Sequence, residues 1–206
     1  MECSVYRVPM RHPGDVSAIL RLIDEGMLAA GAIAAIFGKT EGNGCVNDFT
    51  RGYALSALSA ALAPRLGIAP DAVPSRIAMV MSGGTEGGLS PHFLVFATIA
   101  GDEPRADRKA LAIGTASTAP LRPEEIGRMP QVNATAAAVR EAMHRADIAG
   151  SADVHWVQIK CPLLTRERVA EAKARGLRTA TADTYASMGL SRGAGALGAA
   201  LALGEV

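Results

Sequence analysis

The stretch AAIFGKTEGNGCVNDFTR, residues 34–51, holds the pattern from which the rest of the fold can be predicted. The apolar run Ile33–Phe37 is typical of a buried strand, which ends at Gly38 and places Lys39 in a glycine-rich segment. A lysine at the end of a buried strand is unfavourable unless its charge is paired or used. Lys39 is therefore the first candidate functional residue.

The same pattern occurs a second time in the chain. The apolar run Val154–Ile159 is a second predicted strand, and it precedes Lys160. Downstream of each lysine, a hydroxyl–Arg–Gly triplet opens an alanine-rich helix: Thr50-Arg51-Gly52 in the first case, Ser191-Arg192-Gly193 in the second. Two matching units of this kind indicate an internal repeat.

The composition excludes several classes of function. Of the 206 residues, 49% are hydrophobic and 20% charged, and the formal net charge of +1 leaves no basic surface for nucleic acid or an acidic membrane. The three cysteines, Cys3, Cys45 and Cys161, are odd in number and show no C-x-x-C spacing, which favours a reducing, cytoplasmic setting. We expect no export signal and no membrane span, because no apolar run has the required length.

The first repeat is expected to contain four strands and two helices. The predicted strands are Cys3–Pro9, Ile33–Phe37, Arg76–Met81 and His92–Ala100. Apolar residues at helical spacing predict helices near residues 16–27 and 51–66.

A polar, charged segment at residues 102–109 predicts a linker between a first repeat, residues 1–101, and a second, residues 110–206. In the second repeat we expect a strand Ala110–Ser117, a helix from about Asn133 to Ala146, the strand before Lys160, a helix Leu164–Gly176, a loop Asp183–Gly189 and a helix from Arg192 to Leu203. The predicted fold class is α+β, with tandem repeats that each pack a small sheet on helices.

The spacing of the repeats predicts that the second is truncated. Ser82 follows Arg51 by 31 residues, and the same interval from Arg192 would end at position 223, whereas the sequence ends at Val206. We therefore expect the second equivalent of Ser82-Gly83 to be absent from these residues.

Ser82-Gly83 alone would be interpreted as a tight turn. Ser82 follows a predicted strand, just as Lys39 does, and this shared position favours a functional interpretation. The Ser82 hydroxyl and Gly83 N–H could bind a carbonyl oxygen.

A cation at a helix N-terminus is unfavourable, and a carbonyl-rich or anionic ligand would explain why Arg51 and Arg192 occupy such positions.

Two other sites are rejected. Gly38-Lys39-Thr40 is similar to the end of a phosphate-binding loop, but position 33 is Ile33 where that motif requires glycine. The four histidines have no metal-ligand spacing, so no metal site is predicted.

Five motifs together resemble the cyanuric acid hydrolase/barbiturase family of ring-opening amidohydrolases: GKTEGNGCVNDFTR, MSGGTEGGLSPH, EEIGR, VQIKCPLLT and ADTYASMGLSRGA. The resemblance covers nearly the whole chain and places it in the N-terminal part of the family's chain. It implies three repeats around a pseudo-threefold axis, with three Lys–Ser pairs and three arginines around one pocket. One complete repeat, one truncated repeat and no third repeat are then expected here.

The resemblance also implies roles for individual residues. Lys39 and Ser82 would form the first Lys–Ser pair, and Arg51, Ser82 and Gly83 would bind substrate.

Lys160 matches the family's catalytic lysine and Arg192 its second substrate-binding arginine. The family's nucleophilic serine would lie in the second repeat's missing loop. No cofactor is expected for catalysis, the family's metal site would lie in the absent third repeat, and a homotetramer is implied.

Three hypotheses follow. The first is a cyclic amide hydrolase that opens cyanuric acid by Ser–Lys nucleophilic catalysis, with barbituric acid as the alternative small-molecule substrate. The second is a non-catalytic ligand-binding relative. The third is an assembly piece that requires a separately encoded C-terminal half.

Overall fold

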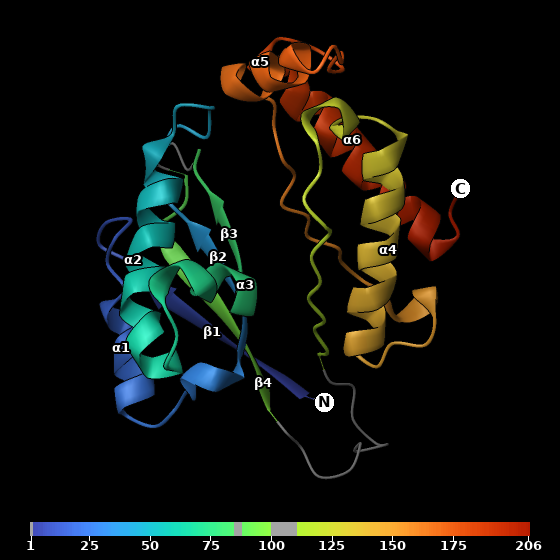
Figure 1. Ribbon diagram of the computed structural model, residues 1–206. Helices are drawn as coiled ribbons and strands as arrows, with labels where there is room; N and C mark the ends of the chain where they lie inside the picture. Colours follow the sequence, from blue (N-terminus) through green and yellow to red (C-terminus); the bar gives the residue numbers. More distant parts are fainter. Residues whose placement is uncertain (1, 85–87, 100–110) are drawn as a thin grey trace. The chain divides into compact units, whose positions relative to one another are not determined.

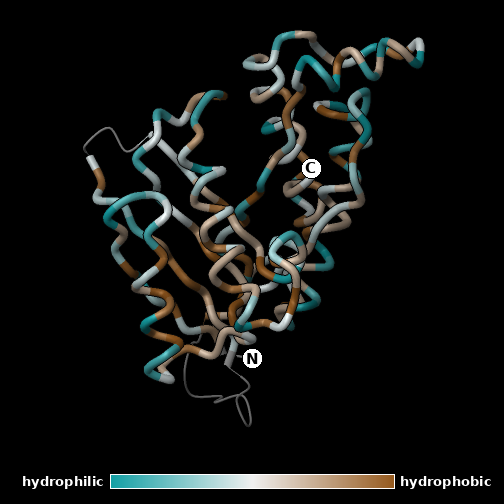
Figure 2. Tube along the Cα trace, turned by 60° about the vertical axis from the view of Figure 1, so that its left-hand side comes forward, coloured by the Kyte–Doolittle hydropathy of each residue, from teal (hydrophilic) through white to brown (hydrophobic). Residues whose placement is uncertain are grey.

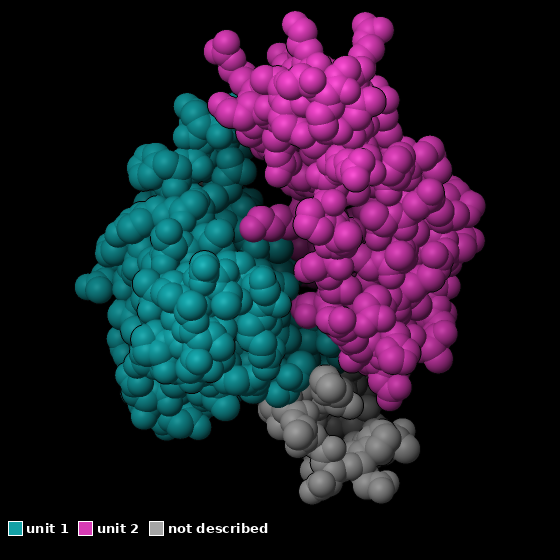
Figure 3. All heavy atoms as spheres, viewed as in Figure 1, with its two compact units in different colours: residues 1–113 teal, residues 114–206 magenta. Residues whose placement is uncertain are grey.

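The computed structural model describes residues 2–84, 88–99 and 111–206 (Figure 1). The chain divides into two compact units, residues 1–113 and 114–206, which Figure 3 colours separately. The predicted linker, residues 102–109, lies outside the described residues.

The first unit is built on a four-stranded mixed sheet in the order β1-β4-β2-β3. The strands are β1 (Glu2–Pro9), β2 (Ile33–Lys39), β3 (Ala78–Ser82) and β4 (His92–Ile99). Strand β4 lies between β1 and β2 and pairs antiparallel with both, whereas β2 and β3 are parallel. All four strands predicted in this unit are confirmed, with β3 beginning two residues later than predicted.

The helices of this unit cover one face of the sheet (Figure 1). They are α1 (Ser17–Asp24), α2 (Phe49–Leu66) and α3 (Val73–Arg76), with short 3₁₀ turns η1 (Ala30–Ala32) and η2 (Pro70–Ala72). Helix α2 ends at Gly67, whose φ of 66° suits glycine. Helix α1 is shorter than predicted, and Gly26, with φ of 74°, follows its end.

The core of the first unit lies between these helices and the sheet. Its fully buried side chains include Ile19, Ile36, Leu58, Leu62, Phe93 and Val95. In Figure 2 the brown, hydrophobic residues lie along the strands and helices, whereas many of the connecting segments are teal. A smaller cluster on the other face of the sheet contains Cys3, Ala35 and Phe96, and Ile113 packs against it.

We expect Asp15, just before α1, to make the stability of the first unit pH-dependent. Its carboxylate accepts hydrogen bonds from Arg11 Nε at 2.7 Å and Ser17 Oγ at 2.6 Å, which hold the pKa of Asp15 well below its ordinary value. A lowered folded-state pKa contributes stability that is complete above the unfolded value of about 3.9 and is lost as the pH falls further.

The measurement is the denaturant midpoint between about pH 5 and pH 3. The midpoint should fall on acidification, and it should fall less in Asp15→Asn than in the parent. Asp71→Asn, which changes an exposed residue, is the control. Equal acid sensitivity of Asp15→Asn and the parent would contradict the expectation.

The second unit is helical in its described residues. It contains η3 (Pro123–Glu125), α4 (Met129–Arg145), η4 (Ser151–Asp153), α5 (Arg166–Ala174) and α6 (Thr184–Leu203). The predicted helices near 133–146 and 164–176 are confirmed as α4 and α5. Among residues 2–84, 88–99 and 111–206, no helix is long and apolar enough to cross a membrane.

The strands predicted at Ala110–Ser117 and Val154–Ile159 are wrong, because residues 111–117 and 154–159 form no strand. In the first unit, β1 and β2 do not pair with each other; each pairs with β4 between them. The described part of the second unit contains no strand equivalent to β4. The Cys3 N–H of β1 donates to the Leu111 carbonyl oxygen at 2.9 Å, but neither segment forms a continuous ladder with a strand among the described residues, and apolar composition alone cannot supply one.

The predicted loop Asp183–Gly189 is also wrong, since α6 begins at Thr184. Asp183 caps the helix, accepting a hydrogen bond from the Ala186 N–H at 2.6 Å. Arg192 consequently lies inside α6 and not at its start. Gly189 lies within α6, where a single glycine costs the helix only about 1 kcal/mol, which packing can offset.

Helices α4 and α6 pack closely through a glycine and a buried polar contact. A Cβ at Gly198 would lie 2.6 Å from both the Val132 carbonyl oxygen and the Thr135 Cβ, so only glycine allows this approach. Gln131 Nε2 donates to the Ser191 hydroxyl at 2.9 Å, which satisfies both groups in the buried interface.

Gly198→Ala should therefore destabilise the second unit by about 1–3 kcal/mol, because the new methyl group overlaps backbone that cannot easily move. Gly193→Ala is the matched control in the same helix, where a Cβ would meet nothing within 4 Å. It should be neutral or stabilising by up to about 1 kcal/mol through helix propensity. The measurement is the denaturant midpoint of each variant. Equal midpoints for Gly198→Ala and Gly193→Ala would contradict the close packing of α4 against Gly198.

Candidate active site

The carboxyl ends of β2 and β3 bring Lys39 and Ser82 together. The two strands are parallel, and their register pairs Lys39 with Ser82. Lys39 Nζ lies 3.1 Å from Ser82 Oγ and donates to the Gly83 carbonyl oxygen at 2.9 Å. Lys39 is half-buried and Ser82 is exposed, so the serine oxygen is open to an incoming molecule. The predicted contact between these residues is observed.

Two buried threonines, Thr40 and Thr50, connect the backbone of Ser82 to the start of α2 by hydrogen bonds. Thr40 donates its N–H to the Ser82 carbonyl oxygen at 2.8 Å, and its hydroxyl lies 3.3 Å from the same oxygen. The Thr50 and Thr40 hydroxyl oxygens lie 2.9 Å apart. The start of α2 is thereby connected to the backbone of Ser82.

The carboxylate of Asp48 lies at the centre of the surrounding loops. Oδ1 accepts from the Thr50 N–H at 3.0 Å and from the Thr50 hydroxyl, and Oδ2 accepts from the Gly44 N–H at 2.9 Å. Burial acts to raise the pKa of Asp48, but these hydrogen bonds and the charge of Arg51 hold it below its ordinary value. Asp48 is therefore a buried, ionised carboxylate.

Arg51 lies in the first turn of α2, as predicted. Its Nη2 donates to the Cys45 carbonyl oxygen, and its Nε lies 3.6 Å from Asp48 Oδ2. These contacts offset the unfavourable position of a cation at a helix N-terminus. The position of Arg51 therefore does not by itself require an anionic ligand, contrary to the argument from sequence.

Two glycines allow the loops to close around Asp48. A Cβ at Gly42 would overlap Asp48 Oδ1, and a Cβ at Gly83 would overlap Asp48 Oδ2 and lie 2.9 Å from the Gly44 nitrogen. The Gly84 N–H donates to the Gly42 carbonyl oxygen, which joins the two loops directly. The glycine-rich composition of this region thus follows from close packing against one side chain.

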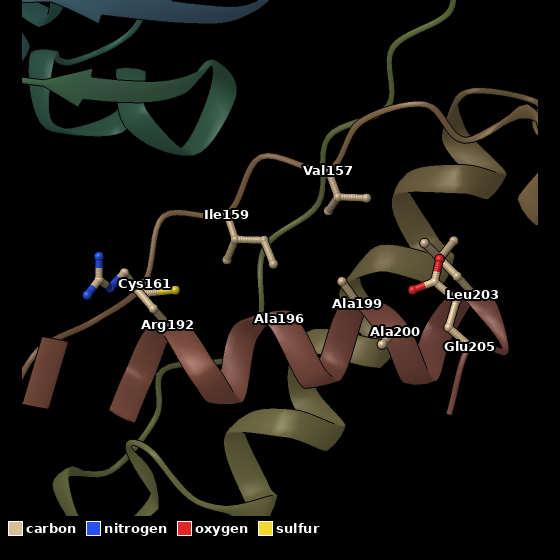
Figure 4. A pocket seen from close by; sticks show the side chains of 9 residues that line it. All are labelled: Val157, Ile159, Cys161, Arg192, Ala196, Ala199, Ala200, Leu203 and Glu205. Carbon is tan, nitrogen blue, oxygen red and sulfur yellow. The ribbon is translucent and has the colours of Figure 1, made fainter. Parts of the chain in front are cut away.

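Lys160 and Arg192 belong to the second unit. Lys160 is exposed in a segment without regular structure, and it makes no hydrogen bond or ion pair with any residue that the structure describes. Arg192 is exposed on α6 and lines a cavity of 410 Å³ together with Cys161 (Figure 4). Burial raises the pKa of the Cys161 thiol, against the opposing effects of a Ser191 hydrogen bond and the Arg192 charge.

The lining of this cavity is mostly apolar. Val157 and Ile159 face α6 from the extended segment, and Arg192 and Glu205 lie at opposite ends of the row of α6 and C-terminal residues in Figure 4. The remaining lining residues are Ala196, Ala199, Ala200 and Leu203. The cavity has the character of a packing groove between a strand-like segment and a helix.

Sequence reasoning did not identify Asp48, Thr40 and Thr50. One signal was available, because an aspartate directly before an alanine-rich helix is a preferred N-cap. The contacts of Asp48 with residues 42–44 and 83 were not available, since they depend on how the loops fold.

Within residues 2–84, 88–99 and 111–206, no three His, Cys, Asp or Glu side chains are grouped so that they could hold a metal ion.

The first unit is a four-stranded α+β unit with a Lys–Ser pair at its strand ends, an arrangement suited to nucleophilic hydrolysis. Comparison with known proteins identifies the family. The family described as "Amidohydrolase ring-opening protein" matches residues 4–206. The chain belongs to this family of ring-opening amidohydrolases, as the sequence motifs predicted, and the predicted α+β class is confirmed.

Curated relatives include cyanuric acid amidohydrolases from Enterobacter cloacae and Azorhizobium caulinodans. The first is 54% identical over 209 residues, covering 100% of this chain and 56% of the relative. The second is 57% identical over 202 residues, covering 98% of this chain and 55% of the relative. The chain thus spans little more than half the length of these relatives.

Solved structures of cyanuric acid hydrolases are also similar to this chain. A cyanuric acid hydrolase structure superimposes with a TM-score of 0.92 at 51% identity, covering 100% of this chain and 57% of that one. The A. caulinodans enzyme superimposes with a TM-score of 0.91 at 56% identity, covering 100% of this chain and 56% of that one.

Proposed function

We propose that this chain is part of a cyclic amide hydrolase that opens the ring of cyanuric acid. The observation that carries the proposal is the 54–57% identity to cyanuric acid amidohydrolases over almost the whole chain. The hydrogen-bonded Lys39–Ser82 pair is consistent with it. By family resemblance, the proposed enzyme is a cytoplasmic homotetramer that needs no cofactor for catalysis.

The proposed reaction is nucleophilic. A lysine in its neutral form takes the proton of a serine hydroxyl, and burial and neighbouring cations favour that form. The serine oxygen attacks a ring carbonyl carbon, the ring C–N bond breaks with proton transfer to nitrogen, and water releases the ring-opened product from the acyl-enzyme.

Each site residue has a proposed role. Lys160 is the catalytic base for the family's nucleophilic serine, which is not among these residues. Lys39 and Ser82 form the first Lys–Ser pair, in which the Gly83 carbonyl oxygen accepts one lysine N–H and so orients the amine towards Ser82. The Ser82 hydroxyl and Gly83 N–H bind a ring carbonyl oxygen.

Arg51 and Arg192 are the proposed substrate-binding arginines. Each is permanently charged and can make a planar, two-pronged contact with a carbonyl or a ring anion. Cyanuric acid has alternating carbonyl and N–H groups, so three repeats that each supply Arg, Lys and Ser-Gly would match its symmetry.

A chimera tests the proposal. Residues 1–206 are joined to the part of the A. caulinodans relative that this chain does not cover, and ring opening of cyanuric and barbituric acid is measured. We expect turnover of cyanuric acid in excess of that of barbituric acid. The reverse preference would indicate a barbiturase, and binding of cyanuric acid without turnover would indicate a non-catalytic relative.

Arg51→Lys in this chimera should reduce kcat/KM by about tenfold or more, because lysine cannot reproduce the planar contact. The control is Arg65→Lys at the other end of α2, where Arg65 pairs with Asp24 at 2.8 Å. Activity of Arg51→Lys equal to that of the control would contradict the proposed binding role.

A further inference from the structure

We propose that Asp48 is a positioning residue, whose buried carboxylate holds Arg51 and the loop of Ser82 and Gly83 in the geometry that binds substrate. The inference rests on the proposed function of Lys39, Ser82 and Arg51, and it adds a residue that touches none of the reacting atoms.

Three chain segments meet at the side chain of Asp48. The Asp48 side chain is 0% exposed, and its oxygens contact the Gly42–Gly44 loop, the first turn of α2 and the Ser82–Gly83 loop. Moving the carboxylate would therefore shift all three segments together.

A chain of hydrogen bonds connects Asp48 to Ser82. The Thr50 hydroxyl contacts both Asp48 Oδ1 and Thr40 Oγ1, and Thr40 in turn bonds the Ser82 carbonyl oxygen. Each member of this chain of hydrogen bonds is buried except Ser82, which is exposed at its end. Buried networks with every polar group satisfied hold a single geometry.

The guanidinium group of Arg51 is held at two points. Its Nη2 donates to the Cys45 carbonyl oxygen and its Nε lies 3.6 Å from Asp48 Oδ2, and together these contacts fix its direction. A long, flexible cation held in this way loses less freedom when substrate binds. Helix capping alone requires only the Thr50 N–H contact and explains neither the Gly44 bond nor the approach to Gly83.

Asp48→Asn in the chimera is the principal test. Asparagine is an equally good N-cap, so the cap on α2 is retained. The amide nitrogen, however, cannot accept from Gly44 or pair with Arg51. We expect kcat/KM to fall by about 10²-fold, the loss typical of a site displaced by about 1 Å.

The matched control is Asp183→Asn, at the N-cap of α6, where the side chain accepts from the Ala186 N–H and from no other described residue. Asp48→Asn should lose activity at a temperature and denaturant concentration where its unfolding curve shows it folded, whereas Asp183→Asn should keep its activity. A double-mutant cycle with Arg51→Lys adds a readout that a merely structural role would not change. If Asp48 acts through Arg51, the loss from Asp48→Asn should be much smaller in the Arg51→Lys background.

A second pair of variants decides the matter if Asp48→Asn fails to fold. Thr50→Val removes the bridging hydroxyl with little change of shape and should lower kcat/KM, whereas Thr50→Ser keeps the hydroxyl and should restore most of it. The inference is overturned if Asp48→Asn equals Asp183→Asn, if the cycle is additive, or if Thr50→Val equals Thr50→Ser. A chimera without activity on either ring would contradict the proposed function instead, and the unfolding midpoints would show that its fold is intact.

Discussion

The purified 206-residue chain is expected to open the cyanuric acid ring about 10⁶-fold more slowly than the A. caulinodans relative, a loss typical of removing a nucleophile that acts as a unit with its base. Lys160, the proposed base, is exposed and has no serine partner among the described residues. Exposure to water also weakens each polar contact that the site could make with substrate. The measurement is the initial rate of ring-opened product formation at equal protein concentration.

The control is the chimera, which contains the same 206 residues and should be active. Product formation by the isolated chain that disappears in Ser82→Ala would contradict the prediction. It would show that Lys39 and Ser82 act as a complete nucleophilic pair, with association of chains providing the remainder of the pocket.

Lys160→Ala in the chimera should lower kcat by about 10²–10⁴-fold, the usual contribution of a positioned general base. Lys39→Ala should lower kcat less, because the family resemblance assigns the catalytic step to Lys160. Lys173→Ala, which changes an exposed lysine on α5, is the control for loss of a surface charge and should leave kcat unchanged.

The contacts in the structure favour the opposite order of effects for the two lysine variants. In the described residues Lys39, and not Lys160, is the lysine that is hydrogen-bonded to a serine. If Lys39→Ala proved the more damaging variant, Lys39 would be the base and Ser82 the nucleophile, and the assignment by resemblance would be wrong. Equal losses would also exclude the proposed order.

The fold of the first unit could be predicted closely from the sequence. Its strands and helices show clear apolar periodicity, and every strand finds its partner within residues 2–99. The same completeness explains why the predicted contact between Lys39 and Ser82 is observed. Both end predicted strands, and the parallel pairing of β2 and β3 places them opposite each other.

Two predicted strands are wrong. Residues 111–117 and 154–159 have a strand-like composition, but they form no continuous ladder with any strand among the described residues. Strand formation depends on hydrogen bonds to another segment, whereas helices α4 and α5 satisfy their own backbone and were predicted correctly.

The sequence by itself determined the family and the class of the fold and proposed Lys39, Ser82 and Arg51 as candidate site residues, because these depend on motifs and local periodicity. Only the tertiary structure decided that Asp48 joins Arg51 to the loops of Gly44 and Gly83, and that Arg192 lies inside α6. Those features depend on which distant segments meet. A buried carboxylate such as that of Asp48 selects its partners by geometry and by the need to satisfy its charge, and neither is visible in the order of the residues.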